Sequence, residues 1–132
     1  MKKAIRYGAA RIRQGLHIQD DEELLNEIRD RHVIVECCPA SNLKLGSVDD
    51  YRRHPIRKLF DLGVPVCVCT DRLRVSGITL EKEYRNLMRY QDFTPHEIYQ
   101  MNINAIQGAF LTQMEKDKLL FKLYEANKNL ID

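Results

Sequence analysis

The sequence predicts an α/β protein with about three parallel strands, flanking helices and an all-helical C-terminal part. Two apolar runs, at residues 33–38 and 64–69, are rich in β-branched side chains, and each has the length of one buried strand. A helical pattern separates them, and after Gly77 the pattern is purely helical. Alternation of strand and helix is typical of right-handed βαβ units, whose strands lie parallel and adjacent.

The first predicted strand is short and unusually polar. Good helix formers over residues 2–10 predict a short helix that runs into a strand at residues 10–13. A second helix begins at a capping aspartate, Asp20 or Asp21, and ends near Arg31, with leucine and isoleucine recurring at helical spacing.

The middle of the chain contains the two apolar strands and one helix. Pro39 ends the first apolar run, and the polar residues 40–51 predict a loop. His54-Pro55 opens a helix, because the missing N–H of proline has no cost in a first turn, and Gly63 ends it.

Three further helices are predicted after the last strand. The first is marked by Leu80 and ends near Gln91. Thr94-Pro95-His96-Glu97 begins the second with a threonine cap, an initial proline and the glutamate of a capping box. The last runs from about Gln113 to Lys128.

Composition sets limits on the class of protein. At 132 residues and 44% hydrophobic, the chain is expected to form one domain over residues 1–132. The net charge of +2 favours neither nucleic acid nor an anionic membrane. No apolar run reaches the roughly 20 residues of a membrane span, and no signal-like segment follows Met1-Lys2-Lys3, so a cytoplasmic location is expected.

The four cysteines lie within the two apolar strands. Their spacing, Cys37-Cys38 and Cys67-x-Cys69, fits neither a disulfide framework nor a zinc knuckle. Reduced, buried, structural thiols are therefore expected.

Polar residues gather at the predicted carboxyl ends of the strands, which share one edge of a parallel sheet. An acid placed directly after a buried strand is how such a sheet delivers a functional side chain, so Asp71 is the first candidate. The edge is expected to collect Arg13, Gln14, Cys38 to Asn42, Asp71, Arg72 and Arg74.

An ordered set of short motifs covers nearly the whole chain. It comprises Ala9-Ala10-Arg11-Ile12 with Gly15, Glu36-x-Cys38-Pro39-x-Ser41-Asn42, His54-Pro55-Ile56, Gly63-Val64-Pro65-Val66, Thr70-Asp71, Leu80-x-x-Glu83-Tyr84, Asn102-x-Asn104-Ala105 and Phe110-Leu111. In this order and spacing the motifs resemble the C-terminal part of the adenosine deaminase family, purine deaminases of the amidohydrolase type. The resemblance implies a partial (β/α) barrel, matching the last three strands of a fold that needs about 250 residues.

The resemblance also implies a chemistry, zinc-dependent hydrolytic deamination of adenosine to inosine. In the family, zinc lowers the pKa of a water that attacks the purine, and its ligands are three histidines and the first acid of a Thr-Asp-Asp motif. Asp71 is the retained candidate ligand. A catalytic zinc needs about three protein ligands, so no cofactor is expected in this chain alone.

Two matched positions depart from the family's motifs. The family's Arg-Ile-Gly-His-Gly is Arg11-Ile12-Arg13-Gln14-Gly15 here, so Gln14 stands at the position of the histidine that orients the attacking water. Arg72 stands at the second acid of Thr-Asp-Asp, which contacts the base. No catalytic residue of the family is intact, and Asp71 could equally be a helix cap or a salt-bridge partner of Arg11 or Arg13.

Four other side chains have open or ordinary interpretations. His54 is interpreted as a capping or packing residue, and Glu36 is either a paired buried acid or a site residue. His32 and His96 are interpreted as a surface residue and a first-turn residue.

Three functions follow from these observations. The first is a deaminase relative that is inactive as this chain alone. The second is a deaminase completed by a partner chain. The third is a module that binds an anion, a purine or a phosphate through Arg13, Arg72 and Arg74, with Lys44 near them.

The predicted sheet has consequences for assembly. Three parallel strands cannot close a barrel, and their outer edges expose unpaired backbone groups. A homo-oligomer, or a partner chain that covers the edges, is therefore expected. In the alternative, the terminal helices fold back over an edge.

Overall fold

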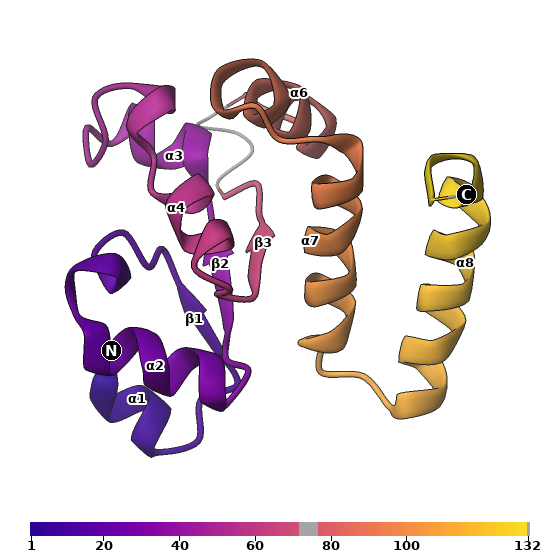
Figure 1. Ribbon diagram of the computed structural model, residues 1–132, viewed down its shortest axis with the longest axis horizontal. Coiled ribbons are helices and arrows are strands. Elements are labelled where there is room, and N and C mark those ends of the chain that lie inside the picture. Colours follow the sequence, from indigo (N-terminus) through magenta and orange to yellow (C-terminus); the bar gives the residue numbers. More distant parts are fainter. Residues whose placement is uncertain (72–76, 132) are drawn as a thin grey trace.

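The computed structural model describes residues 1–71 and 77–131, so Arg72 and Arg74 of the predicted site lie outside the described residues. Three strands, β1 (Arg11–Arg13), β2 (Ile34–Cys37) and β3 (Val66–Val68), form one open parallel sheet in the order β1-β2-β3 (Figure 1). The prediction of three adjacent parallel strands is confirmed.

Helices flank the sheet and make up the C-terminal part. They are α1 (Lys2–Arg6), α2 (Glu22–Asp30), α3 (Pro39–Lys44), α4 (Ile56–Asp61), α6 (Leu80–Gln91), α7 (Pro95–Gln107) and α8 (Gln113–Ile131), with short 3-10 turns η1 (Ile18–Asp20) and η2 (Tyr51–Arg53). The predicted helical C-terminal part is confirmed as α6, α7 and α8 (Figure 1).

The strand register divides the sheet into an apolar and a charged face. Ile12, Val35 and Val66 lie side by side across the three strands and are buried in the core. Leu24, Leu25 and Ile28 of α2 and Ile56 and Leu59 of α4 belong to the same core cluster. Side chains alternate along a strand, so the neighbouring row, Arg13, Glu36 and Cys67, faces the other side.

Helix starts follow the caps expected from the sequence. The carboxylate of Asp21 accepts a hydrogen bond from the N–H of Leu24 at 3.0 Å, which caps α2. At α7, the Thr94 hydroxyl accepts from the N–H of Glu97 at 3.2 Å, and the Glu97 carboxylate accepts from the N–H of Thr94 at 2.8 Å. The predicted capping box is confirmed.

The prediction of a loop over residues 40–51 is wrong at its start. Pro39 does end the strand, but it is also the first residue of α3. The N–H of Ala40, in the first turn of α3, donates to the carboxylate of Glu83 at 2.9 Å. This partner comes from α6, 43 residues away, so local sequence could not reveal it.

The outer edge of β3 is covered by α7. The side-chain amide of Asn104 donates to the backbone oxygen of Val66 at 2.9 Å. On this side, a terminal helix folds over the sheet edge, the alternative considered from the sequence. Within the described residues, no helix combines the length and the apolarity needed to cross a membrane.

Candidate functional site

The carboxyl edge of the sheet brings together residues from two predicted strands. Nη2 of Arg13, the last residue of β1, lies 2.5 Å from Oδ2 of Asp71, which follows β3. The hydrogen bond to Asp71 raises the pKa of Arg13. Of the alternatives open for Asp71, the structure confirms a salt bridge with Arg13.

Gln14 sits at the sharp turn after β1. Its φ of 68° lies in the left-handed region, and its N–H donates to the backbone oxygen of Glu36 at 2.8 Å. At Gly15, which follows, a Cβ atom would lie 2.6 Å from side-chain atoms of both Ile18 and Val35. The turn that carries Gln14 therefore packs tightly against the core, and only glycine fits at position 15.

The charged face of the sheet carries a second ion pair, behind the edge. Nε of Arg11 lies 2.6 Å from Oε1 of Glu36, and the same guanidinium contacts Sγ of Cys67 at 3.7 Å and the backbone oxygen of Ala105 at 3.4 Å. Glu36 is therefore a paired acid, one of the two alternatives predicted. Arg11 links β1, β2, β3 and α7.

The cysteines are free thiols, and Cys37, Cys38 and Cys67 are buried. Burial raises the pKa of Cys37. Hydrogen bonds from the thiols of Cys38 and Cys67 lower the pKa of the half-buried Cys69, with Arg11 and Arg13 acting in the same direction. The expectation of buried thiols is met for Cys37, Cys38 and Cys67, whereas Cys69 is half-buried and electrostatically distinct from them.

The donor set at the edge does not fit a zinc ion. Among residues 1–71 and 77–131, no group of three or more histidines, cysteines or acids is placed to hold a metal. Asp71, the position matched to a ligand, has an arginine against its carboxylate.

His54 has a structural role. Its side chain is buried, Nε2 lies 3.1 Å from Oδ1 of Asn42, and Nδ1 accepts from the N–H of Ile56 at 3.2 Å. Because Nδ1 is an acceptor, the ring is neutral with its proton on Nε2. Burial lowers the pKa of His54 to about 4. The interpretation as a capping and packing residue is confirmed.

Glu83 is a buried acid whose role was not predicted from the sequence. Its carboxylate is fully buried and accepts from the Tyr51 hydroxyl and from the N–H of Ala40. Burial raises the pKa of Glu83, while these two bonds act against the rise. A signal was present, because Glu83 precedes Leu87 by one helical turn and so lies on the buried face of α6.

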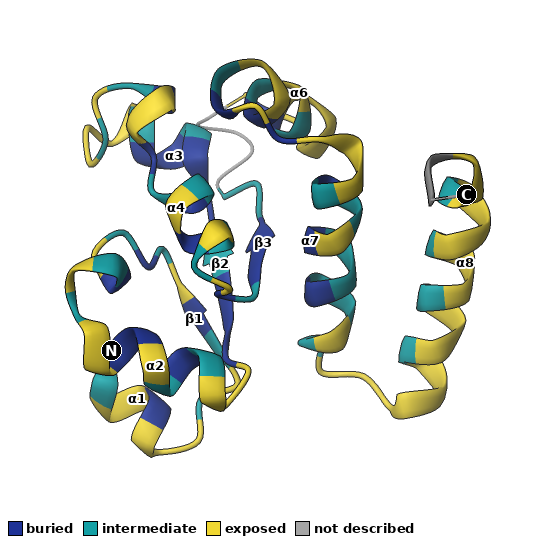
Figure 2. Cartoon of the chain, in the orientation of Figure 1, coloured by how far each residue is buried: buried dark blue, intermediate teal, exposed yellow. Residues whose placement is uncertain are grey.

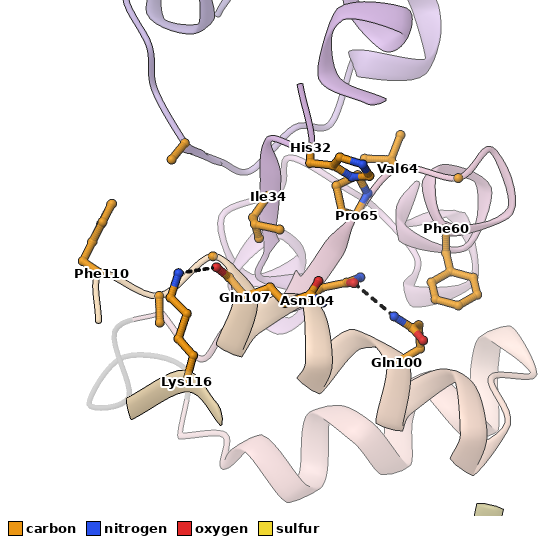
Figure 3. A pocket seen from close by; sticks show the side chains of 14 residues that line it. His32, Ile34, Phe60, Val64, Pro65, Gln100, Asn104, Gln107, Phe110 and Lys116 are labelled. Atoms are coloured by element: carbon orange, nitrogen blue, oxygen red, sulfur yellow. Dashed lines mark hydrogen bonds between the residues drawn. The ribbon is translucent and has the colours of Figure 1, made fainter. Parts of the chain in front are cut away.

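A cavity lies at the opposite end of the strands from this edge. It has a volume of about 610 Å³. One wall is formed where β2 and β3 begin, by Ile34 and Pro65, and the other wall is formed by α7. Three carboxamides of α7, on Gln100, Asn104 and Gln107, line the other wall (Figure 3). Sequence patterns had not singled out this cavity, and none of the predicted site residues lines it.

The fold defines the class of protein. The structure of adenine deaminase from Arthrobacter aurescens superposes with a TM-score of 0.86 and 26% identity, over 90% of this chain and 36% of that one. The three strands and their helices therefore match part of a (β/α) barrel fold.

Sequence comparison identifies the family. The adenosine deaminase family profile matches residues 1–126. The adenosine deaminase of Clostridium acetobutylicum is 40% identical over 115 residues, covering 87% of this chain and 34% of that protein. That of Enterococcus faecalis is 35% identical over 123 residues, covering 93% and 36%. The chain belongs to the adenosine deaminase family and spans about a third of the length of these relatives.

Proposed function

We propose that this chain, by itself, does not deaminate adenosine, and that an ion pair replaces the metal ligation at its sheet edge. The contact of 2.5 Å between Arg13 and Asp71 carries this proposal. Arg13 stands where the family has glycine, so the guanidinium that pairs with Asp71 is itself a departure from the motif.

Electrostatics support the exclusion of a divalent cation. Two like unit charges about 5 Å apart repel by about 3 kcal/mol at an effective dielectric constant of 20, and a doubly charged ion roughly doubles this. A cation on Asp71 would have to displace Arg13 or bind beside it. At the neighbouring position, Gln14 cannot accept and release a proton as histidine does.

The test is metal content together with turnover. The purified chain is incubated with zinc, desalted and analysed for bound metal, and adenosine conversion is followed by ultraviolet absorbance. The deaminase of Clostridium acetobutylicum serves as the positive control. We expect no stoichiometric zinc and no inosine. Stoichiometric zinc with turnover would refute the proposal.

A second candidate is a deaminase completed by a partner chain. The open three-stranded sheet, together with the match to only a third of each relative, favours it. Co-expression with the preceding two thirds of the Clostridium acetobutylicum enzyme, followed by metal analysis of the complex, tests it. Failure to recover a stable complex would count against it.

Anion binding and location stay predictions. Arg72 and Arg74 lie outside the described residues, and Arg13 is already paired with Asp71, so the described part of the chain adds no support for a phosphate or purine site there. A cytoplasmic location likewise rests on the sequence.

A further inference from the structure

Two of the four cysteines lie opposite each other at the ends of neighbouring strands. The register pairs Cys37 of β2 with Val68 of β3, and the N–H of Cys69 donates to the backbone oxygen of Cys37 at 2.8 Å. The parallel ladder therefore continues by one step, to Cys38 and Cys69. Because side chains alternate along a strand, both thiols lie on the charged face of the sheet, two residues beyond the row that contains Glu36.

The side chains of this pair are in contact. The thiol of Cys38 donates a hydrogen bond to Sγ of Cys69. Neighbouring strands lie about 4.8 Å apart, and disulfides join residues whose Cα atoms are about 4.4–6.8 Å apart. The two free thiols therefore have the spacing that a disulfide requires.

The other pairings of the cysteines are less favourable. Cys37 lies on the opposite face of the sheet, in the apolar core. Cys67 is opposite Glu36, and its Sγ contacts Nη2 of Arg11 at 3.7 Å. Along one strand, Cα atoms two residues apart are separated by about 6.6 Å, close to the upper limit for a disulfide. A bond between Cys67 and Cys69 is therefore disfavoured relative to one across the strands.

We propose that Cys38 and Cys69 are an oxidative modification site, at which a peroxide converts the two thiols to a reversible disulfide. Cys69 is half-buried and Cys38 is fully buried, so the oxidant reaches Cys69 first. The Cys69 sulfur, as thiolate, attacks one oxygen of hydrogen peroxide and the O–O bond breaks, which gives a sulfenic acid and, with one proton, water. The Cys38 thiol then loses its proton and attacks the Cys69 sulfur, and the S–O bond breaks to release a second water. Two thiols are oxidised and one peroxide is reduced.

The disulfide joins two segments of the carboxyl edge. Cys38 is the cap residue of α3, and Cys69 lies two residues before Asp71. The bond therefore ties the start of α3 to the segment that carries Asp71, and a thiol reductant releases it. This inference goes beyond the proposed function, because it concerns the thiols of the edge and not its ion pair.

The first test counts thiols. The intact chain is treated with hydrogen peroxide in the presence of a chelator, free thiols are blocked with N-ethylmaleimide in denaturant, and the mass is measured. We expect all four cysteines to react in the reduced chain and two of them after oxidation, with full recovery in dithiothreitol. Retention of all four thiols, a loss that dithiothreitol does not reverse, or a link between two copies of the chain would overturn the proposal.

Variants identify the bonded pair. Trypsin cleaves after Lys44, between the two strands, so a disulfide across them appears as two linked peptides. Cys38→Ser and Cys69→Ser should each remove this link. Cys67→Ser, on the same face of the sheet, is the matched control and should retain it. A link that persists without Cys38 or Cys69, or one that disappears without Cys67, would overturn the assignment.

The thiol count and the proposed function are measured independently. With the chelator present, the number of free thiols does not depend on zinc binding or on turnover of adenosine. A chain that forms the disulfide and also deaminates adenosine would refute only the proposed function. An inactive chain that keeps all four thiols free under peroxide would refute only this proposal.

Discussion

Two polar sites in this chain lie within the motifs that it shares with its family, but their surroundings differ. The buried polar cluster, Asn42, His54 and Glu83, is shielded from water between α3, α4 and α6. The edge ion pair, Arg13 and Asp71, lies at the carboxyl edge, where 54% of the Arg13 side chain is exposed. In the buried polar cluster, Asn42, His54 and Glu83 all match the family motifs. At the edge, Gln14 stands where the family motif has a histidine.

The comparison separates two reasons for a residue to belong to a motif. In the buried polar cluster, an unmatched partner would be left without water, so each substitution has a large energetic penalty. At the edge, the Arg13 side chain is 54% exposed, so water replaces much of what Arg13 loses with its partner, and stability places less constraint on that residue. Motif residues that survive in this chain therefore include many that hold the fold together.

The largest effect is expected at Glu83. Glu83→Ala leaves the Tyr51 hydroxyl and the N–H of Ala40 without their shared acceptor, and should lower the free energy of unfolding by about 3 kcal/mol or more. Urea denaturation followed by circular dichroism measures this. Glu83→Gln keeps the shape and an acceptor oxygen and is the milder control. An alanine variant as stable as wild type would mean that the cluster does not support the fold.

A pH effect of intermediate size is expected from His54. Because the pKa of His54 falls from 6.5 to about 4 on folding, its contribution to stability is complete above pH 6.5 and is lost as the pH falls toward 4. The loss amounts to roughly 3 kcal/mol at most. Glu83 acts in the opposite sense, because its pKa is raised on folding and protonation favours the native state.

Urea midpoints measured between pH 7.5 and 4.5 test this. His54→Gln should flatten the pH dependence, whereas His17→Gln, at an exposed histidine, should not. Parallel loss of stability in wild type and the His54 variant would show that other groups are responsible.

The smallest effect is expected at the edge. Arg13→Ala should lower the free energy of unfolding by less than about 1 kcal/mol, and the difference should shrink in high salt, because about half of the Arg13 side chain is exposed to water. Arg53→Ala, which removes the exposed pair with Asp49, gives the baseline for a surface ion pair. If Arg13→Ala lowered the free energy of unfolding several times more than Arg53→Ala, with no effect of salt, the edge ion pair would stabilise the fold as strongly as the buried polar cluster does.

Much of the fold was predictable because it rests on local patterns. The apolar runs define β2 and β3, and the capping residues Asp21 and Thr94 define the starts of α2 and α7. Helix α3 was not predicted, because its first turn is completed by Glu83 from another helix. Similarly, the apolar residues of α8 predicted a helix but could not show that Met114 and Phe121 would stay exposed (Figure 2).

The sequence predicted which residues lie at the candidate site but not which of them form an ion pair. Parallel topology placed Arg13, Gln14 and Asp71 at one edge, and the motifs matched them to family positions. Several partners were open to Asp71, and the distance to Arg13 decided among them. The roles of Glu83 and of the cavity beside α7 follow from contacts between distant segments, which periodicity does not encode.

The sequence by itself determined the family, the parallel strand order, the helix caps and the departures at Gln14 and Arg72, since each of these is carried by residue identity and local spacing. Only the tertiary structure decided that Arg13 holds Asp71, that Glu83 completes α3, and that apolar side chains of α8 stay exposed. These depend on which distant side chains meet and which are left without a neighbour, and burial and distance are properties of the folded chain alone.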